Sequence, residues 1–149
     1  MTVEPDALGE AREVARISAH VDSEDISLLV GRASDGGYCQ IVRSDRTPTN
    51  RSCSIALPNR DEIGVSAMNF GGAPGGVLLL VGPAGSDIAT LEVRYQDGRT
   101  ATAHLSEHWV LYEVDPSDYV QGRRPELLVA RDASGNEIAS ERLPWATPG

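Results

Sequence analysis

The residues best suited to chemistry in this chain are two histidines, His104 and His108, which flank Leu105-Ser106-Glu107. A zinc protease needs His-Glu-x-x-His on a helix, so that both imidazoles reach one metal ion. Here the glutamate occupies a different position, and apolar and polar residues alternate around it as they do in a strand. The pattern therefore favours surface histidines beside a turn. A metal-dependent enzyme, in which both imidazoles converge with a third ligand such as His20, is the alternative.

The second reactive pair is Cys39 and Cys53. Neither belongs to a Cys-x-x-Cys pair, so the spacing indicates neither a zinc ribbon nor a thioredoxin-like site. In an exported protein we expect one disulfide that closes a polar loop, worth roughly 3 kcal/mol for a loop of about 15 residues in the chain-entropy model. The alternatives are two unrelated buried thiols, or a cysteine nucleophile that works with one of the histidines.

The charge of the chain limits the partners it can bind. The net charge is −9, and such a field repels phosphate backbones and anionic lipid, which argues against nucleic-acid and membrane-surface binding. All 13 basic residues are arginine. Without lysine the chain has neither a Schiff-base nucleophile nor the lysine of a Walker A phosphate loop. We expect no cofactor.

The length of 149 residues suits one domain, which we place at residues 1–149. The glycine-rich segment 71–76 predicts a sub-boundary within it; no lysine and no helical pattern follow, so we interpret it as a connector. No apolar run approaches the roughly 18–20 residues of a membrane-spanning helix. The N-terminus lacks the basic and apolar segments of a signal peptide. We therefore expect either a cytosolic protein or a sequence that begins after an export signal or anchor.

The elements that position these residues are predicted to be strands, and the clearest pair is 88–95 with 100–105. A two-residue turn at Asp97-Gly98 would place apolar residues opposite polar ones, which conflicts with burial of one face. A turn that is one residue longer pairs Val93 with Ala101 instead. That turn needs its glycine in the left-handed conformation, so we predict a positive φ at Gly98.

Alternation of apolar and polar residues predicts strands along the rest of the chain. Residues 1–13 are expected to form a short helix or strand appendage, residues 44–54 a polar loop, and residues 88–143 a meander or part of a sandwich. The predicted fold class is all-β, an antiparallel β-sandwich of the immunoglobulin-like or a related kind. The other predicted strands are 15–21, 26–32, 37–43, 54–57, 61–68, 77–81, 108–114, 126–132 and 137–143.

A resemblance covers residues 87–143. Its strands and turns carry Thr90-Leu91-Glu92-Val93, Asp97-Gly98-Arg99-Thr100 and Ala133-Ser134-Gly135-Asn136. This region resembles a segment of exported or membrane-anchored, largely uncharacterised proteins of high-GC Gram-positive bacteria, and its hairpins are similar to those of bacterial immunoglobulin-like domains. The resemblance implies a β-sandwich in an extracytoplasmic protein, and it transfers no functional residue.

Aromatic residues are scarce, at 5% of the chain. Trp109 and Tyr112 fall in a predicted strand, and we expect them in the core. Trp145, beside a proline, and Tyr119 are the candidates for a surface that contacts a partner.

Together these patterns favour a non-catalytic, extracytoplasmic interaction or accessory module with a protein partner, no nucleic acid and no membrane insertion within the chain. Two other functions stay as alternatives. One is a small hydrolase or metal-dependent enzyme that uses the His104/His108 region, which needs at least three polar side chains converging in a pocket. The other is a cytosolic structural subunit, which needs reduced cysteines.

Overall fold

The computed structural model describes residues 11–18, 25–34, 36–44, 49–70, 77–118, 120 and 122–143. Within these ranges the chain forms twelve strands and one 3-10 turn, and the strands make three antiparallel sheets of four strands each. The predicted all-β sandwich is confirmed. No helix in these ranges is long and apolar enough to cross a membrane. The predictions that fall outside them concern residues 1–10 of the appendage, the connector 71–76, His20, Tyr119 and Trp145.

Each sheet has its own strand order. The first sheet is β1-β2-β3-β4, with β1 (Arg12–Ser18), β2 (Asp25–Arg32), β3 (Tyr38–Arg43) and β4 (Asn50–Ile55). The middle sheet is β5-β6-β10-β9, with β5 (Ser66–Phe70), β6 (Val77–Pro83), β9 (Leu105–Ser106) and β10 (Trp109–Glu113). The third sheet is β12-β11-β7-β8, with β7 (Thr90–Tyr95), β8 (Thr100–Ala103), β11 (Pro125–Arg131) and β12 (Glu137–Arg142). The 3-10 turn η1 (Pro116–Asp118) follows β10.

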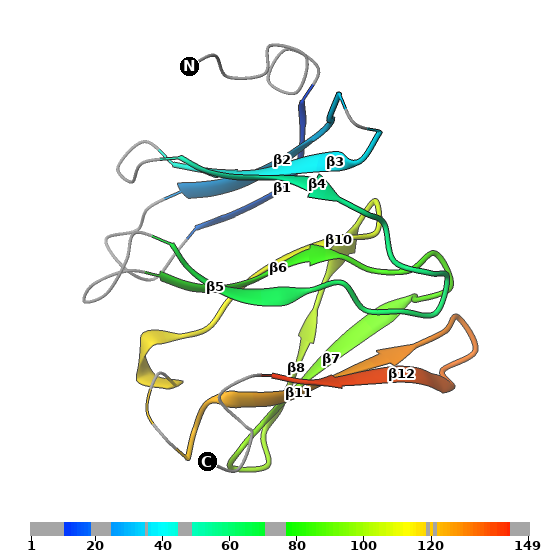
Figure 1. The fold of residues 1–149 in the computed structure, drawn as a ribbon. Helices are drawn as coiled ribbons and strands as arrows, with labels where there is room; N and C mark the ends of the chain where they lie inside the picture. Colours follow the sequence, from blue (N-terminus) through cyan, green and yellow to red (C-terminus); the bar gives the residue numbers. More distant parts are fainter. Residues whose placement is uncertain are drawn as a thin grey trace.

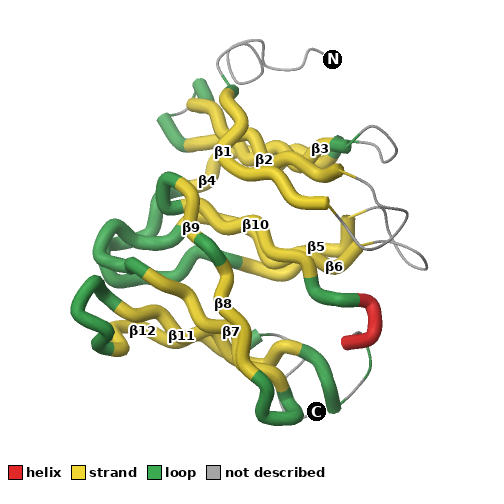
Figure 2. Tube along the Cα trace, turned by 180° about the vertical axis from the view of Figure 1, so that it is seen from behind, coloured by secondary structure: helices red, strands yellow, loops and turns green. Residues whose placement is uncertain are grey.

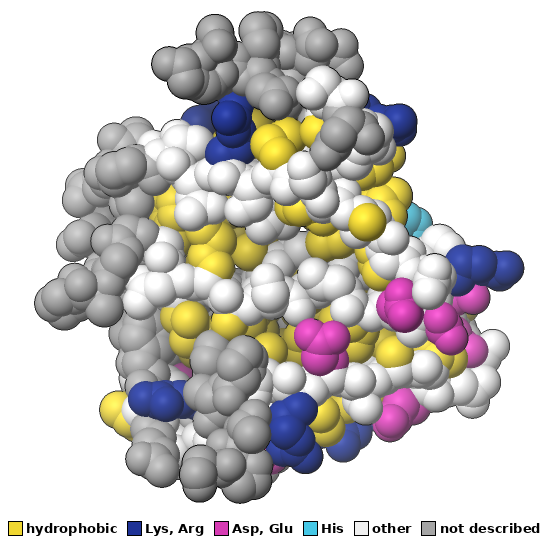
Figure 3. All heavy atoms as spheres, viewed as in Figure 1, with side chains coloured by type: hydrophobic (Ala, Val, Ile, Leu, Met, Phe, Trp, Pro, Cys, Tyr) yellow, Lys and Arg dark blue, Asp and Glu magenta, His cyan; other side chains and the backbone are white. Residues whose placement is uncertain are grey.

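The three sheets stack as layers, and the middle sheet is covered on both faces (Figure 1). We call the interface of the first and middle sheets the first core, and that of the middle and third sheets the second core. In β6, Leu79 and Val81 pack in the first core and Leu80 packs in the second. A strand that is buried on both faces does not alternate, which explains its uninterrupted apolar run. Figure 3 shows hydrophobic side chains at the levels between the layers.

The register predicted for the β7–β8 hairpin is confirmed. Val93 pairs with Ala101 and Leu91 with Ala103. Gly98 has a φ of 93°, and its N–H donates to the carbonyl oxygen of the residue before the three-residue turn at 3.0 Å. The apolar side chains of both strands therefore face the second core.

The predicted block 88–143 contributes to two sheets. The chain leaves the third sheet at His104, after β8, and enters the middle sheet as the short strand β9 (Figure 2). Strand β10 then begins at Trp109, one residue later than predicted, and pairs with β6. The expectation of part of a sandwich is confirmed, whereas a single continuous meander is wrong, because this crossing carries the aromatic strand into a different layer.

Two sequence predictions around the first sheet are wrong. The loop predicted for 44–54 includes β4, an edge strand that pairs with β3 and takes in the start of the strand predicted for 54–57. The side chains of β4 are mostly polar, so the sequence shows no alternation of apolar and polar residues there. Pairing with β3 stabilises this strand instead. The strand predicted for 61–68 is not continuous: Ile63 makes one isolated bridge to Ala84, and β5 starts later.

Candidate ligand-binding cleft

A cavity of about 310 Å³ opens at one end of the space between the first and middle sheets. We call it the cleft. The first sheet forms one wall, and β10 with the segment after β6 forms the opposite wall. The linker from β4 to β5 and the turn between β9 and β10 form the sides. The lining residues are Arg12, Val30, Tyr38, Leu57, Pro58, Ala84, Ser86, Glu107, His108 and Trp109.

Two aromatic rings form the inner wall of the cleft. Tyr38 begins β3 and Trp109 begins β10, and their ring centroids lie 6.3 Å apart at an interplanar angle of 60°. The Arg32 guanidinium lies 5.1 Å from the centroid of the Tyr38 ring and donates to the Tyr38 hydroxyl at 3.3 Å. Trp109 is 4% exposed. The rings are therefore held in a fixed orientation, with a cation beside them.

The turn at the side of the cleft is strained. Ser106 pairs with Trp109, so Glu107 and His108 are the two turn residues, and their φ angles are 52° and 70°. Such turns favour glycine or asparagine, because other side chains crowd the left-handed backbone. The prediction that His108 begins the next strand is wrong, since this tight turn takes up that residue. Strained backbone tends to cluster at binding and catalytic sites, where the surroundings maintain it.

An ion pair joins the first sheet to this turn across the mouth of the cleft. Arg12 of β1 donates to the Glu107 carboxylate, and their side chains are 61% and 53% exposed. Figure 1 shows the turn between β9 and β10 rising from the middle layer toward the first sheet. An exposed pair of this kind contributes roughly 1 kcal/mol or less, so a ligand can exchange one of its partners at little cost.

Leu57 gives the cleft an exposed apolar side. Its side chain is 52% exposed, in a linker that backbone hydrogen bonds anchor to the middle sheet. The N–H of Gly85 donates to the carbonyl oxygen of Glu62 at 2.8 Å. A Cβ at Gly85 would lie 2.2 Å from the carbonyl oxygen of Asn59. Glycine at this position is what lets the linker approach so closely.

The structure separates the residues that the sequence singled out. His108 lines the cleft, whereas His104 lies between β8 and β9, and both are exposed. Trp109 is buried in the first core, as predicted, whereas Tyr112 is only half-buried and packs against the second core. In the described part of the chain, no three or more histidine, cysteine, aspartate or glutamate side chains group in a way that could hold a metal ion.

Sequence reasoning missed the residues that make the cleft: Arg12, Tyr38 and Leu57. Nothing in their local sequence distinguishes them, because they come together through sheet pairing and the stacking of layers. The one available signal was indirect. Tyr38 directly precedes Cys39, so a disulfide at that cysteine restrains the strand that carries the ring.

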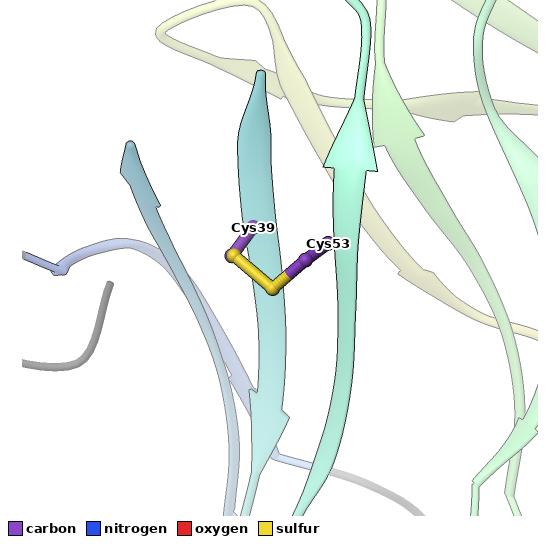
Figure 4. Close-up of a disulfide and its surroundings, with 2 residues drawn as sticks. All are labelled: Cys39 and Cys53. Carbon is purple, nitrogen blue, oxygen red and sulfur yellow. A yellow bond between two sulfur atoms is a disulfide. The ribbon is translucent and has the colours of Figure 1, made fainter. Parts of the chain in front are cut away.

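The predicted disulfide between Cys39 and Cys53 is confirmed (Figure 4). Neither cysteine is free. The bond joins β3 to its neighbour β4, and not a strand to a loop as predicted, because residues 50–55 pair as a strand. Cys39 is fully buried. The crosslink therefore ties together two strands of the sheet that forms one wall of the cleft.

A charged network on the third sheet has a structural role. Arg99 donates to Asp118 Oδ1 at 2.7 Å, and Arg123 donates to the same oxygen at 3.1 Å. The Asp118 side chain is 6% exposed. Its hydrogen bond, and then that of Asp97, raise the pKa of Arg99. Because opposite charges are paired within the network, it attaches η1 to the β7–β8 hairpin.

Two other hollows are less suited to a ligand with apolar parts. One lies on the first sheet and is lined by Arg16, Asp25, Ser27, Arg43 and Ser44. The other is lined by Asp61, Ser86, Asp87, Asp132, Ala133, Ser134 and Ile138. Neither contains an aromatic ring, and charged groups in both already have partners: Arg16 with Glu13 at 3.0 Å, and Asp87 with Arg60 at 3.2 Å.

No protein-family model, curated protein or solved structure matches this chain. The relation to exported proteins of high-GC Gram-positive bacteria and the immunoglobulin-like character therefore stay predictions.

Proposed function

We propose that this chain is a non-catalytic, extracytoplasmic interaction module, and that its cleft binds a segment of a protein partner. The observation that carries the proposal is the composition of the cleft. Two packed aromatic rings and the exposed Leu57 border a space of about 310 Å³, and charged side chains stand at its mouth. Apolar walls with a few polar groups that fix orientation are typical of ligand sites, and buried aromatic residues are typical anchors of interfaces.

The disulfide supports the extracytoplasmic part of the proposal. Disulfides form and persist in oxidising compartments, whereas thiols are kept reduced in the cytosol. The Cys39–Cys53 bond restrains the first sheet, which provides one wall of the cleft. In an exported module, this crosslink would therefore maintain the conformation of the cleft before a partner binds.

The test is selection of binders from a library of random peptides on the oxidised chain, followed by affinity measurement by fluorescence anisotropy. Leu57→Ser removes an apolar contact and is expected to weaken binding of the selected peptides roughly tenfold. Val120→Ser is the matched control, because Val120 is also 52% exposed but does not line the cleft. It should leave the affinities unchanged.

Two outcomes would overturn the proposal. The first is a selection that yields no binder. The second is that Leu57→Ser and Val120→Ser change the affinities of the selected peptides to the same extent. That result would place the contact elsewhere on the molecule.

A further inference from the structure

We propose that the cleft recognises the C-terminal residue of the partner chain: a bulky apolar side chain enters the space beside Tyr38 and Leu57, and the terminal carboxylate binds Arg12. This inference rests on the proposed function and specifies its ligand. Three features of the cleft carry it, namely its size, its inner end and its charge.

The size and the inner end of the cleft favour a chain terminus. About 310 Å³ is at the small end of ligand sites, enough for one large side chain with its carboxylate. Val30, at 1% exposed, and Trp109, at 4%, are core residues, so the space ends at the packed first core. A chain cannot continue inward past them. An occupant therefore fills the cleft with a single side chain, and a chain terminus can do so with its carboxylate at the mouth.

The charge at the mouth favours an anionic group. Arg12 stands at the mouth, and Arg32 lies over the Tyr38 ring, while Glu107 is the one carboxylate in the lining. The strands of the first sheet are locally basic within a chain of net charge −9: they carry five arginines and two acidic residues. Guanidinium groups bind carboxylates through two parallel hydrogen bonds. A terminal carboxylate lies close enough to its own side chain to reach Arg12 while that side chain is buried.

The exposed Arg12–Glu107 pair gives the mechanism of entry. The incoming carboxylate takes the place of the Glu107 carboxylate on Arg12, and Glu107 stays in water, where it needs no protein partner. The hollow that contains Asp61, Asp87 and Asp132 cannot serve the same ligand, because its carboxylates would repel an anion.

The experiment measures fluorescence anisotropy of a labelled synthetic peptide of glycine and serine residues that ends in leucine with a free carboxylate. Amidation of that terminus, or replacement of the leucine by serine, is expected to weaken binding about tenfold or more. Arg12→Gln is expected to weaken binding of the free-acid peptide to a similar extent and to leave the affinity for the amidated peptide unchanged. Glu107→Gln removes the competing carboxylate and is expected to tighten binding of the free acid.

The matched control is Arg16→Gln. Arg12 and Arg16 both belong to β1, both pair with a glutamate, and their side chains are 61% and 59% exposed. Only Arg12 lines the cleft. Arg16→Gln should therefore leave the affinity for the free acid unchanged.

Equal affinities for the acid and the amide, or equal effects of Arg12→Gln and Arg16→Gln, would overturn the inference. The proposed function is tested separately by the library peptides. If they depend on Leu57 but need no free terminus, the cleft binds an internal segment and only the inference fails. If no peptide of either kind binds, both fail.

Discussion

The two outer sheets pack on opposite faces of the same middle sheet, but they are attached to it differently. At the second core, the chain crosses directly from β8 to β9, and the hydroxyls of Tyr95 and Tyr112 hydrogen-bond at 2.6 Å between β7 and β10. At the first core, the disulfide lies within the first sheet, and the ion pair at the open end, Arg12–Glu107, is exposed.

This difference explains the position of the cleft. In the second core the two tyrosine hydroxyls are paired in a part-buried position, so this polar contact joins the two layers from within. In the first core the ion pair at the open end is exposed, and the aromatic wall behind it is reachable. On the face shown in Figure 3, acidic side chains lie over the lower layers together with several basic ones. The weaker closure between layers therefore coincides with the candidate site.

The largest effect is expected from Gly85→Ala, which disturbs the attachment of the linker that carries Leu57. The new Cβ would meet the carbonyl oxygens of Asn59 and Arg60 at 2.2 and 2.3 Å. Backbone must shift to make room, at a cost of about 3 kcal/mol in the free energy of unfolding. Urea denaturation measures this loss.

Gly98→Ala is the control. Gly98 has a φ of 93°, but a Cβ there would meet nothing within 4 Å, so we expect a loss of only about 1 kcal/mol in the free energy of unfolding. Equal losses in the two variants would contradict the role of close packing.

Removal of the crosslink in the first sheet is expected to have an effect of similar size. The double variant Cys39→Ala, Cys53→Ala should lose roughly 3 kcal/mol in the free energy of unfolding, because the unfolded chain gains conformational freedom. Urea denaturation of the oxidised protein and the variant measures the difference. A thiol count on denatured protein complements it. We expect no reactive thiol before reduction and two after, and two thiols without reductant would contradict both the bond and the extracytoplasmic proposal.

The smallest effect is expected at the second core, from Tyr95→Phe. Loss of the hydrogen bond to Tyr112 should cost about 1 kcal/mol at neutral pH. Burial, and then that hydrogen bond, raise the pKa of Tyr95, so the folded state favours the neutral phenol. This contribution to stability is complete below the unfolded pKa of about 10 and is lost as pH rises above it.

Urea denaturation at neutral pH and above pH ~10 tests this prediction. The wild-type protein should lose more stability across that interval than Tyr95→Phe does, since the variant has no phenol to ionise at that position. Identical losses would show that other groups determine the alkaline behaviour.

Local sequence was enough to predict the hairpins and the disulfide. The β7–β8 register followed from Val93 and Ala101 having to share a buried face, and the left-handed Gly98 followed from that register. The pairing of Cys39 with Cys53 followed from their number and context. These features depend on residues close in the chain, or on a choice among very few partners.

Only the tertiary structure decided the number of layers and the composition of the cleft. Strand β4 exists because β3 offers it a pairing edge, and β6 serves two cores because a sheet covers each of its faces. Arg12, Tyr38, Leu57 and Glu107 line one cleft although they come from distant parts of the chain, and the left-handed turn at Glu107 is maintained by the strands on either side. The physical reason is that alternation along a strand fixes which residues face inward, but not which sheet they will face.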